Sequence, residues 1–160
     1  MSPSDRPRVY FAHPINTYRT ALERRCIGFL KAAFPGHTIV NPGSRAVVKR
    51  AEAIKARFSP EEYDTAGSRA VMQYFLDDLI PGCAALVGLP YPDGLYLAGV
   101  GKEMLHAHER GIPVWSLTHI LALARIRDPS RDIVILSIDE TRQRVYEWPS
   151  RVLRPYPSLA

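Results

Sequence analysis

The sequence lacks three features that would direct it to a membrane or to an oxidising compartment. No apolar run approaches the roughly 20 residues that a membrane-spanning helix requires. The first eight residues contain no apolar stretch of the signal-peptide kind. The two cysteines, Cys26 and Cys83, lie in apolar surroundings without the spacing of metal ligands. These absences predict a cytoplasmic protein with reduced thiols and no membrane partner.

Internal repeats, linkers and low-complexity tracts are also missing. The 160 residues are enough to bury a core without disulfides or metals, so a single domain over 1–160 is expected. A net charge of +5 and a pI near 9.4 favour acidic partners. The basic residues are scattered, however, and no nucleic-acid motif with interleaved aromatic residues is present among them. Direct nucleic-acid binding is therefore not expected.

The first forty residues have the pattern of a strand, a helix and a second strand. A short apolar run over 8–12 is followed by apolar residues at helical spacing over 22–33 and by a β-branched run over 38–40. Such a βαβ unit is right-handed and places the loop after its first strand at the carboxyl edge of a parallel sheet. Because open α/β sheets bind ligands at that edge, the loop 13–19 is a candidate binding segment.

The rest of the chain continues to alternate helices and strands. The expected elements are a helix over 45–58, further helix opened by the capping box Ser59-Pro60-Glu61-Glu62, a helix over 68–80, strands over 83–89 and 113–117, a short helix over 121–126, and a terminal hairpin of 132–138 with 144–148. This order predicts an α/β fold with a flavodoxin-like or Rossmann-like parallel sheet sandwiched by helices, ending in a C-terminal β-hairpin. Fold class alone leaves the function open.

The segment 99–114 is the part of the chain that most resembles a functional site. Two glycines, Gly99 and Gly101, are expected to form a loop that opens a helix, with Glu103 in its first turn. A carboxylate there lies close to the free N–H groups of the helix and can meet a ligand. The structural alternative is that Glu103 only stabilises the helix dipole, by about 0.3 to 1 kcal/mol.

The same segment resembles the nucleoside 2-deoxyribosyltransferase superfamily, whose glycine loop supplies a glutamate and closes on Ala-x-x-x-Gly-Lys-Pro-Val. The residues that match are Glu103, Ala107, Gly111, Pro113 and Val114. The run Val9-Tyr10-Phe11-Ala12-His13-Pro14 is similar to the opening strand of that superfamily, and Asp77 and Asp78 before Gly82-Cys83 resemble its acidic helix. The similarity extends from Val9 to Leu117.

The resemblance implies cleavage of the N-glycosidic bond of a nucleoside or nucleoside 5′-monophosphate. Glu103 would be the nucleophile, as in a retaining glycosidase, and Tyr10 would orient it. Asp77 would give the leaving base its proton, with Asp78 and Asp93 as alternatives for that role or for holding the edge of the base. Water as acceptor makes the protein a hydrolase, and a second base makes it a transferase. The other residues implied in substrate binding are His13, Asn16, Arg19, Asp78, Asp93, Gly99 and Gly101. No metal or organic cofactor is needed, and the superfamily implies a homo-oligomer.

Several of these residues have purely structural alternatives. Tyr10 fits a core aromatic residue, His13 before a proline fits a turn, and Asp93 before Gly94 fits a turn as well. Asp93 also lies further from Glu103 than the aspartate of the superfamily does. Asp77 and Asp78 cannot both face the same way on a helix, so at least one is a solvated charge.

Two other function classes stay open at this level. The first is a nucleotide-sensing module with the same fold and no turnover, and the second is a basic protein associated with nucleic acid. The sequence does not distinguish the base, the sugar, the need for a 5′-phosphate or the acceptor.

Overall fold

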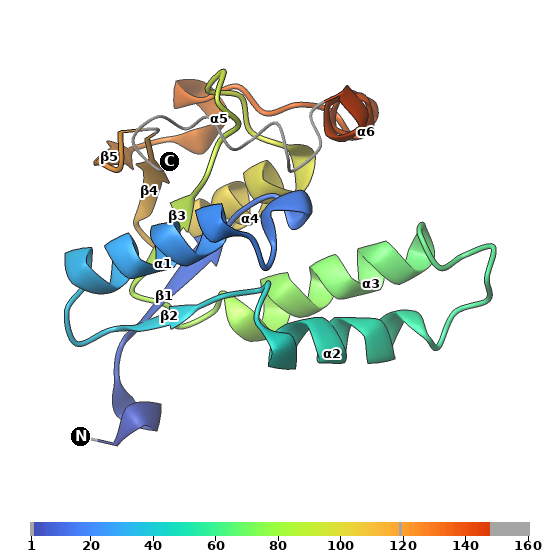
Figure 1. Cartoon of the computed structure of the whole chain (residues 1–160), viewed down its shortest axis with the longest axis horizontal. Helices are drawn as coiled ribbons and strands as arrows, with labels where there is room; N and C mark the ends of the chain where they lie inside the picture. The colour runs from blue at the N-terminus through green and yellow to red at the C-terminus, as the bar shows by residue number, and fades with distance from the viewer. Residues whose placement is uncertain (1, 119, 148–160) are drawn as a thin grey trace.

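The computed structural model describes residues 2–118 and 120–147, which form one five-stranded sheet with helices packed around it (Figure 1). The strands are β1 (Arg8–Ala12), β2 (Thr38–Val40), β3 (Ala85–Gly88), β4 (Val114–Leu117) and β5 (Leu123–Ile126). They form one sheet in the order β2-β1-β3-β4-β5, in which the first four strands are parallel and β5 is antiparallel to β4. The fold is therefore α/β, and its sheet has the flavodoxin-like strand order, which confirms the expected fold class.

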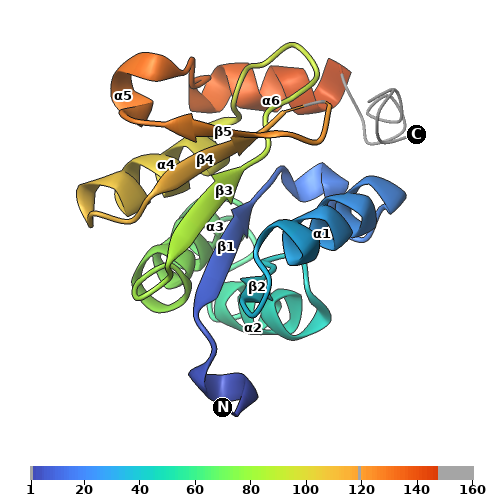
Figure 2. The ribbon, with the colours of Figure 1, turned by 90° about the vertical axis from the view of Figure 1, so that its left-hand side faces the viewer.

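Helices cover both faces of the sheet (Figure 2). The helices are α1 (Ala21–Ala33), α2 (Arg45–Lys55), α3 (Ala66–Tyr74), α4 (Ala98–Glu109), α5 (Pro129–Asp132) and α6 (Ile138–Glu147), with short turns η1 (Pro3–Asp5), η2 (Ile15–Thr17) and the π-helical η3 (Phe75–Leu79). Alternate residues of β1 point to opposite faces. Val9 and Phe11 pack with residues of α1, whereas Tyr10 and Ala12 pack with residues of η3 and α4. The near-continuous apolar run of β1 is thus buried on both sides.

The first half of the chain follows the sequence pattern closely. β1 and β2 have the expected bounds, and α1 and α2 lie where apolar residues recur at helical spacing. Thr20 and Ser44 start these two helices by accepting the N–H groups of Glu23 and Val47. β3 and β4 also lie within the expected ranges.

The capping box expected at 59–62 does not open a helix, so that prediction is wrong. The Glu62 carbonyl accepts the N–H groups of Thr65 and Gly67, which closes a turn there, and α3 begins only at Ala66. Lys55, at the end of α2, pairs with Asp64 in this turn at 3.2 Å. The connection reverses the chain so that α3 packs against α2.

The terminal hairpin is also wrong, and so is the helix expected over 121–126. Leu123–Ile126 forms β5, because Thr118 and Ala122 exchange hydrogen bonds that fold the chain back along β4. Residues 138–147 form α6 instead of a strand, with a reciprocal capping box between Ser137 and Glu140. Residue 148, at the end of the predicted hairpin, lies outside the described residues.

In the part of the chain that the structure describes, no helix combines the length and the apolar character that a membrane crossing requires.

Gly101 allows α4 to pack closely against the segment before α6. A Cβ at this position would lie 2.3 Å from Ile135 Cγ2. Gly101→Ala should therefore lower the free energy of unfolding by about 1 to 3 kcal/mol, as overpacked cores do. At a roomy helix position the same change stabilises by up to about 1 kcal/mol. Denaturant unfolding of wild type and of Gly101→Ala measures the difference between their free energies of unfolding.

Gly28 is the matched control, because it is an exposed glycine of α1 with open space around it. Gly28→Ala should stabilise the protein, and Ile135→Ala should relieve part of the Gly101→Ala cost. Equal changes in the free energy of unfolding for Gly28→Ala and Gly101→Ala would show that the contact with Ile135 does not affect stability.

Candidate functional site

The candidate site lies where the order of the strands reverses, at the carboxyl ends of β1 and β3. Chains leave these neighbouring strands in opposite directions along the sheet, which opens a crevice between the two following loops. The β1–α1 loop and the β3–α4 loop are linked across it, because the Asn16 Nδ2 group donates to the Tyr91 hydroxyl at 2.7 Å. Asn16 thus has a bridging position in the described structure.

Glu103 lies in the second turn of α4 rather than in the first. The helix begins at Ala98, so Gly99 and Gly101 are helical residues and do not form a loop before it. The predicted glycine loop is therefore wrong. Both glycines instead allow α4 to pack closely against its neighbours. A Cβ on Gly99 would lie 3.3 Å from the Met72 methyl group, and Gly101 faces Ile135.

Glu103 faces Tyr10 in the interior, and both residues are at most 5% exposed. Burial raises the pKa of the Glu103 carboxyl to about 8, and the Tyr10 hydroxyl lowers it in part by stabilising the carboxylate. Burial and the Glu103 charge raise the pKa of Tyr10 in turn. The two groups are close enough to interact. Among the described residues, however, neither Tyr10 Oη nor Glu103 Oε2 has a hydrogen-bond partner of standard geometry.

An unsatisfied buried carboxyl is unusual in a folded protein. Nearly all buried polar groups have partners, since an unpaired one costs about 1 to 3 kcal/mol or more. Perturbed acids of this kind are concentrated at functional sites. The structure thus brings together the Tyr10 and Glu103 pair that the motifs single out, and Glu103 Oε2 is buried without a hydrogen-bond partner.

Tyr18 links this pair to a second buried acid. It is half-buried on the β1–α1 loop, and burial, the Glu103 charge and the Glu23 charge all raise its pKa. The second acid, Glu23, lies on the inward face of α1. The two carboxyl groups thus occupy one polar cluster at the end of β1.

His13 and Glu23 form a buried hydrogen-bonded pair. The His13 Nε2 atom lies 2.8 Å from Glu23 Oε2, and Nδ1 lies 2.8 Å from the Phe11 carbonyl. Nδ1 must carry hydrogen to bond a carbonyl oxygen. Burial raises the pKa of Glu23, but the hydrogen bond from His13 and the neighbouring polar groups outweigh this effect, so the pKa of Glu23 is lowered overall. His13 is therefore a buried hydrogen-bonding partner of Glu23, more than the turn residue that its proline neighbour indicates.

Two backbone segments, at Arg19 and at Gly43, lie close to the His13 and Glu23 pair. Arg19 has a left-handed conformation with φ of 60°, an uncommon one for a residue other than glycine. Its backbone N–H group hydrogen-bonds Glu23, which helps to lower the pKa of that acid. Gly43 passes so close that a Cβ there would lie 2.4 Å from Glu23 Oε2. The exposed Arg19 side chain has no role in these contacts.

The three aspartates of the sequence prediction are not brought to Glu103. Asp77 and Asp78 are exposed on η3, and Asp77 accepts from Gln73 Nε2 at 2.7 Å. Asp93 lies in a turn with Gly94 and pairs with Arg144 of α6. In residues 2–118 and 120–147, no hydrogen bond or ion pair joins any of the three to Tyr10 or Glu103.

Sequence reasoning missed Glu23, Tyr18 and Gly43. A signal for Glu23 was present, because it stands three and seven residues before the buried Cys26 and Leu30, on the same face of α1. Nothing comparable marks Tyr18 or Gly43, whose roles depend on how distant loops meet.

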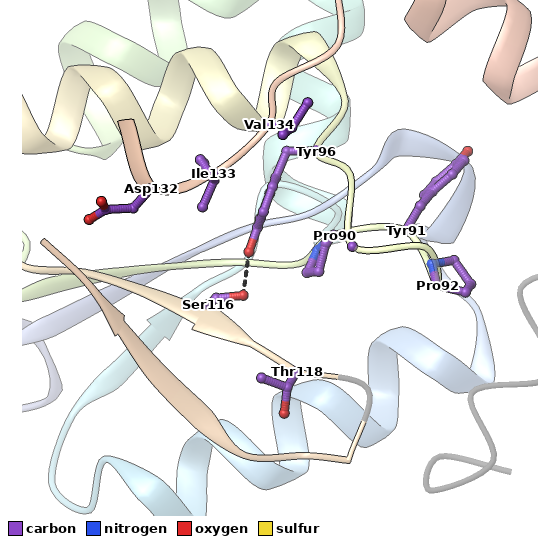
Figure 3. A pocket seen from close by; sticks show the side chains of 10 residues that line it. Pro90, Tyr91, Pro92, Tyr96, Ser116, Thr118, Asp132, Ile133 and Val134 are labelled. Carbon is purple, nitrogen blue, oxygen red and sulfur yellow. Dashed lines mark hydrogen bonds between the residues drawn. The ribbon is translucent and has the colours of Figure 1, made fainter. Parts of the chain in front are cut away.

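A cavity of about 330 Å³ lies beyond the ends of β3 and β4 (Figure 3). Figure 3 shows Tyr96 reaching from the β3–α4 loop to Ser116 on β4, with which its hydroxyl forms a hydrogen bond. Prolines, aromatic rings and hydroxyl groups line the cavity, with Asp132 at its margin. Tyr10 and Glu103 are not among its lining residues, so it is separate from their pair.

The described residues contain no group of three or more histidine, cysteine or acidic side chains arranged to hold a metal ion. Comparisons of the chain with protein-family models, with curated proteins and with solved structures find no match.

Proposed function

We propose that the protein cleaves the N-glycosidic bond of a nucleoside or nucleotide through Glu103. The observation that supports this most directly is the buried Glu103 carboxyl, which has an unpartnered oxygen, a pKa near neutrality and Tyr10 beside it. Its position at the reversal of strand order, where α/β sheets bind ligands, agrees with the motif resemblance.

The reaction requires the ionised form of Glu103. In the first step a carboxylate oxygen bonds to the anomeric carbon as the bond from that carbon to the base nitrogen breaks, and the base leaves with a proton. In the second step water or another base attacks the same carbon and releases Glu103. With a pKa of about 8, roughly one molecule in ten has the carboxylate at pH 7. The rate should therefore rise with pH until Glu103 is ionised.

Tyr10 is the positioning residue in this scheme, because its hydroxyl favours the carboxylate. The role of Asp77 as the proton donor stays a prediction, since its exposed side chain bonds Gln73 instead. Glu103 is only 5% exposed, so a substrate reaches it after neighbouring side chains move. Tyr18, on the β1–α1 loop, is a neighbour whose pKa the Glu103 charge helps to raise.

The test is chromatographic detection of free base after incubation with a panel of nucleosides and 5′-monophosphates, with and without a second base. Wild type should release base, and Glu103→Ala should release it at least about 10³-fold more slowly. Exchange of bases faster than hydrolysis identifies a transferase. Substrate binding without release in either protein would contradict the proposal and indicate a nucleotide-sensing module.

Tyr10→Phe separates a positioning role from a structural one. Removing the hydroxyl removes a donor that lowers the Glu103 pKa, so the rising limb of kcat/KM should move to higher pH than in wild type. A uniform loss of rate with the limb unmoved would mean that Tyr10 only supports the core.

A further inference from the structure

A second cavity, of about 440 Å³, lies between α3, α4 and α6, whose positions Figure 1 shows. We call it the basic cavity. Its lining includes Arg69 from α3, Lys102 from α4 and Arg142 from α6, together with Thr65, Ser68 and Gly99. Its volume is within the range of small-molecule sites. None of its lining residues is shared with the cavity of Figure 3.

The three cations come from separate helices and converge on one space. They are 33 and 40 residues apart in the sequence, so only the fold brings them together. Like charges held near one another repel, and the repulsion weakens when an anion binds between them. Convergence of this kind is the arrangement that binds phosphate groups.

The acidic residues near the cavity do not neutralise it. Asp64, its acidic lining residue, is 89% exposed at the side chain and pairs with Lys55. Arg142 lies 3.9 Å from Asp139, and both side chains are mostly exposed, so the pair is weak. In the described part of the chain no ion pair involves Arg69 or Lys102. The cavity therefore has a net positive charge.

Uncharged donors accompany the cations. Ser68 lines the cavity at the start of α3 beside Thr65, whose hydroxyl donates to the Glu62 carbonyl at 3.3 Å, and Gly99 lies in the first turn of α4. Leu97, the residue before α4, has no side-chain oxygen to cap that helix, and the Thr141 hydroxyl accepts the Ala98 N–H at 2.8 Å in its place. The remaining N–H groups of the first turn of α4, at Gly99 and beyond, add a partial positive charge to the field of the three cations.

We infer that the basic cavity binds the phosphate group of a small organic phosphate through Arg69, Lys102 and Arg142. The inference depends on the cavity and its charges and is independent of the proposed cleavage by Glu103. A sugar phosphate or a nucleoside monophosphate has the required chemistry, since its phosphate meets the cations and the rest of the molecule fills the remaining volume.

The experiment is calorimetric titration at constant ionic strength with inorganic phosphate, ribose 5-phosphate, adenosine 5′-monophosphate and adenosine. The proteins are wild type, Arg69→Ala, Lys102→Ala and Arg142→Ala, with Arg25→Ala as the control. Arg25 is an exposed arginine of α1, a helix that does not line the cavity, so its removal changes net charge by the same amount. The four side chains to be replaced are all exposed, so their removal should not disturb the core. Thermal melts of the four variants check that they are folded.

Wild type should bind the organic phosphates, and each cavity variant should weaken that binding by about tenfold or more, as the loss of a charged hydrogen bond does. Arg25→Ala should leave it unchanged, and inorganic phosphate should compete with the organic phosphates. Stronger binding of ribose 5-phosphate than of inorganic phosphate would show that the sugar adds contacts. Absence of binding to wild type, equal binding of adenosine and its monophosphate, or equal losses in Arg25→Ala and the cavity variants would each overturn the inference. Inorganic phosphate and ribose 5-phosphate have no N-glycosidic bond, so wild type cannot cleave them. Failure of the cavity variants to weaken the binding of ribose 5-phosphate would therefore overturn this inference without bearing on the glycosidic proposal.

Discussion

Glu103→Gln should make the protein more stable relative to wild type as the pH rises from 5 to 8. The folded-state pKa of Glu103, about 8, is above its ordinary value of 4.5. Between these values the unfolded chain has lost the Glu103 proton and the folded protein has kept it. The stability of wild type therefore falls as pH rises through this window and levels off above 8. Glutamine does not titrate, so the difference between the two proteins should grow by about 4 kcal/mol over these three pH units.

Denaturant unfolding at several pH values measures this difference, and taking it as a change with pH removes any constant cost of burying the amide. Glu109→Gln is the control, because Glu109 is an exposed acid on the same helix. Its curve should run parallel to that of wild type. A parallel curve for Glu103→Gln would contradict a protonated Glu103 in the folded protein. The expected gain in stability on removing Glu103 is typical of a side chain kept for function at a cost to the fold.

Glu23→Ala should destabilise the protein by about 3 to 5 kcal/mol near neutral pH, because it leaves a buried His13 without its partner. The folded-state pKa of Glu23 is lowered. The stability that its ionised form contributes is therefore fully present above its ordinary value of 4.5 and is lost as pH falls through the folded-state value. The difference between wild type and Glu23→Ala should shrink accordingly in acid, as urea unfolding at pH 7 and pH 3.5 would measure.

Glu23→Gln distinguishes the ion pair from a simple hydrogen bond. Its amide can still donate to a neutral His13, so the loss should be smaller than for alanine and should depend less on pH. Arg24→Ala, at the exposed neighbouring position of α1, should change stability by less than about 0.5 kcal/mol. If Glu23→Gln lost as much stability as Glu23→Ala, with the same pH dependence, a neutral hydrogen bond would contribute nothing and the whole effect would come from the charge of Glu23. Equal, small losses for both would show that His13 does not need Glu23.

The strands of the parallel sheet were predictable because each is an apolar run bounded by glycine or proline. Arg8–Ala12 and Thr38–Val40 are direct examples. The last part of the sheet was not, since Leu123–Ile126 becomes a strand only by pairing with β4, a tertiary contact that local pattern does not encode. The prediction failed at the start of α6 for a different reason. Ser137 and Glu140 have the spacing of a capping box, and the β-branched residues before them favoured a hairpin instead.

At the site, the sequence predicted the two residues that belong to sequence-local motifs, Tyr10 and Glu103. Their proximity across β1 and α4 agrees with the resemblance, which predicts no particular pKa or hydrogen bonding. The aspartate assignments came from the resemblance to an acidic helix and loop of the superfamily. In the structure Asp77 is exposed and accepts from Gln73, whereas Asp93 pairs with Arg144. Glu23 depends on a contact between α1 and the residue after β1, for which no motif exists.

The two outer strands also bear on how copies of this chain meet one another. β2 has three residues, and on β5 the Arg125 guanidinium donates to the carbonyls of Val114 and Ile126 at 2.7 Å each. A very short strand and a strand that carries a cation are both poor templates for adding a further strand. Aggregation by edge-to-edge pairing is thus discouraged at both ends of the sheet, and any specific self-association of the described fold is left to its helical surfaces.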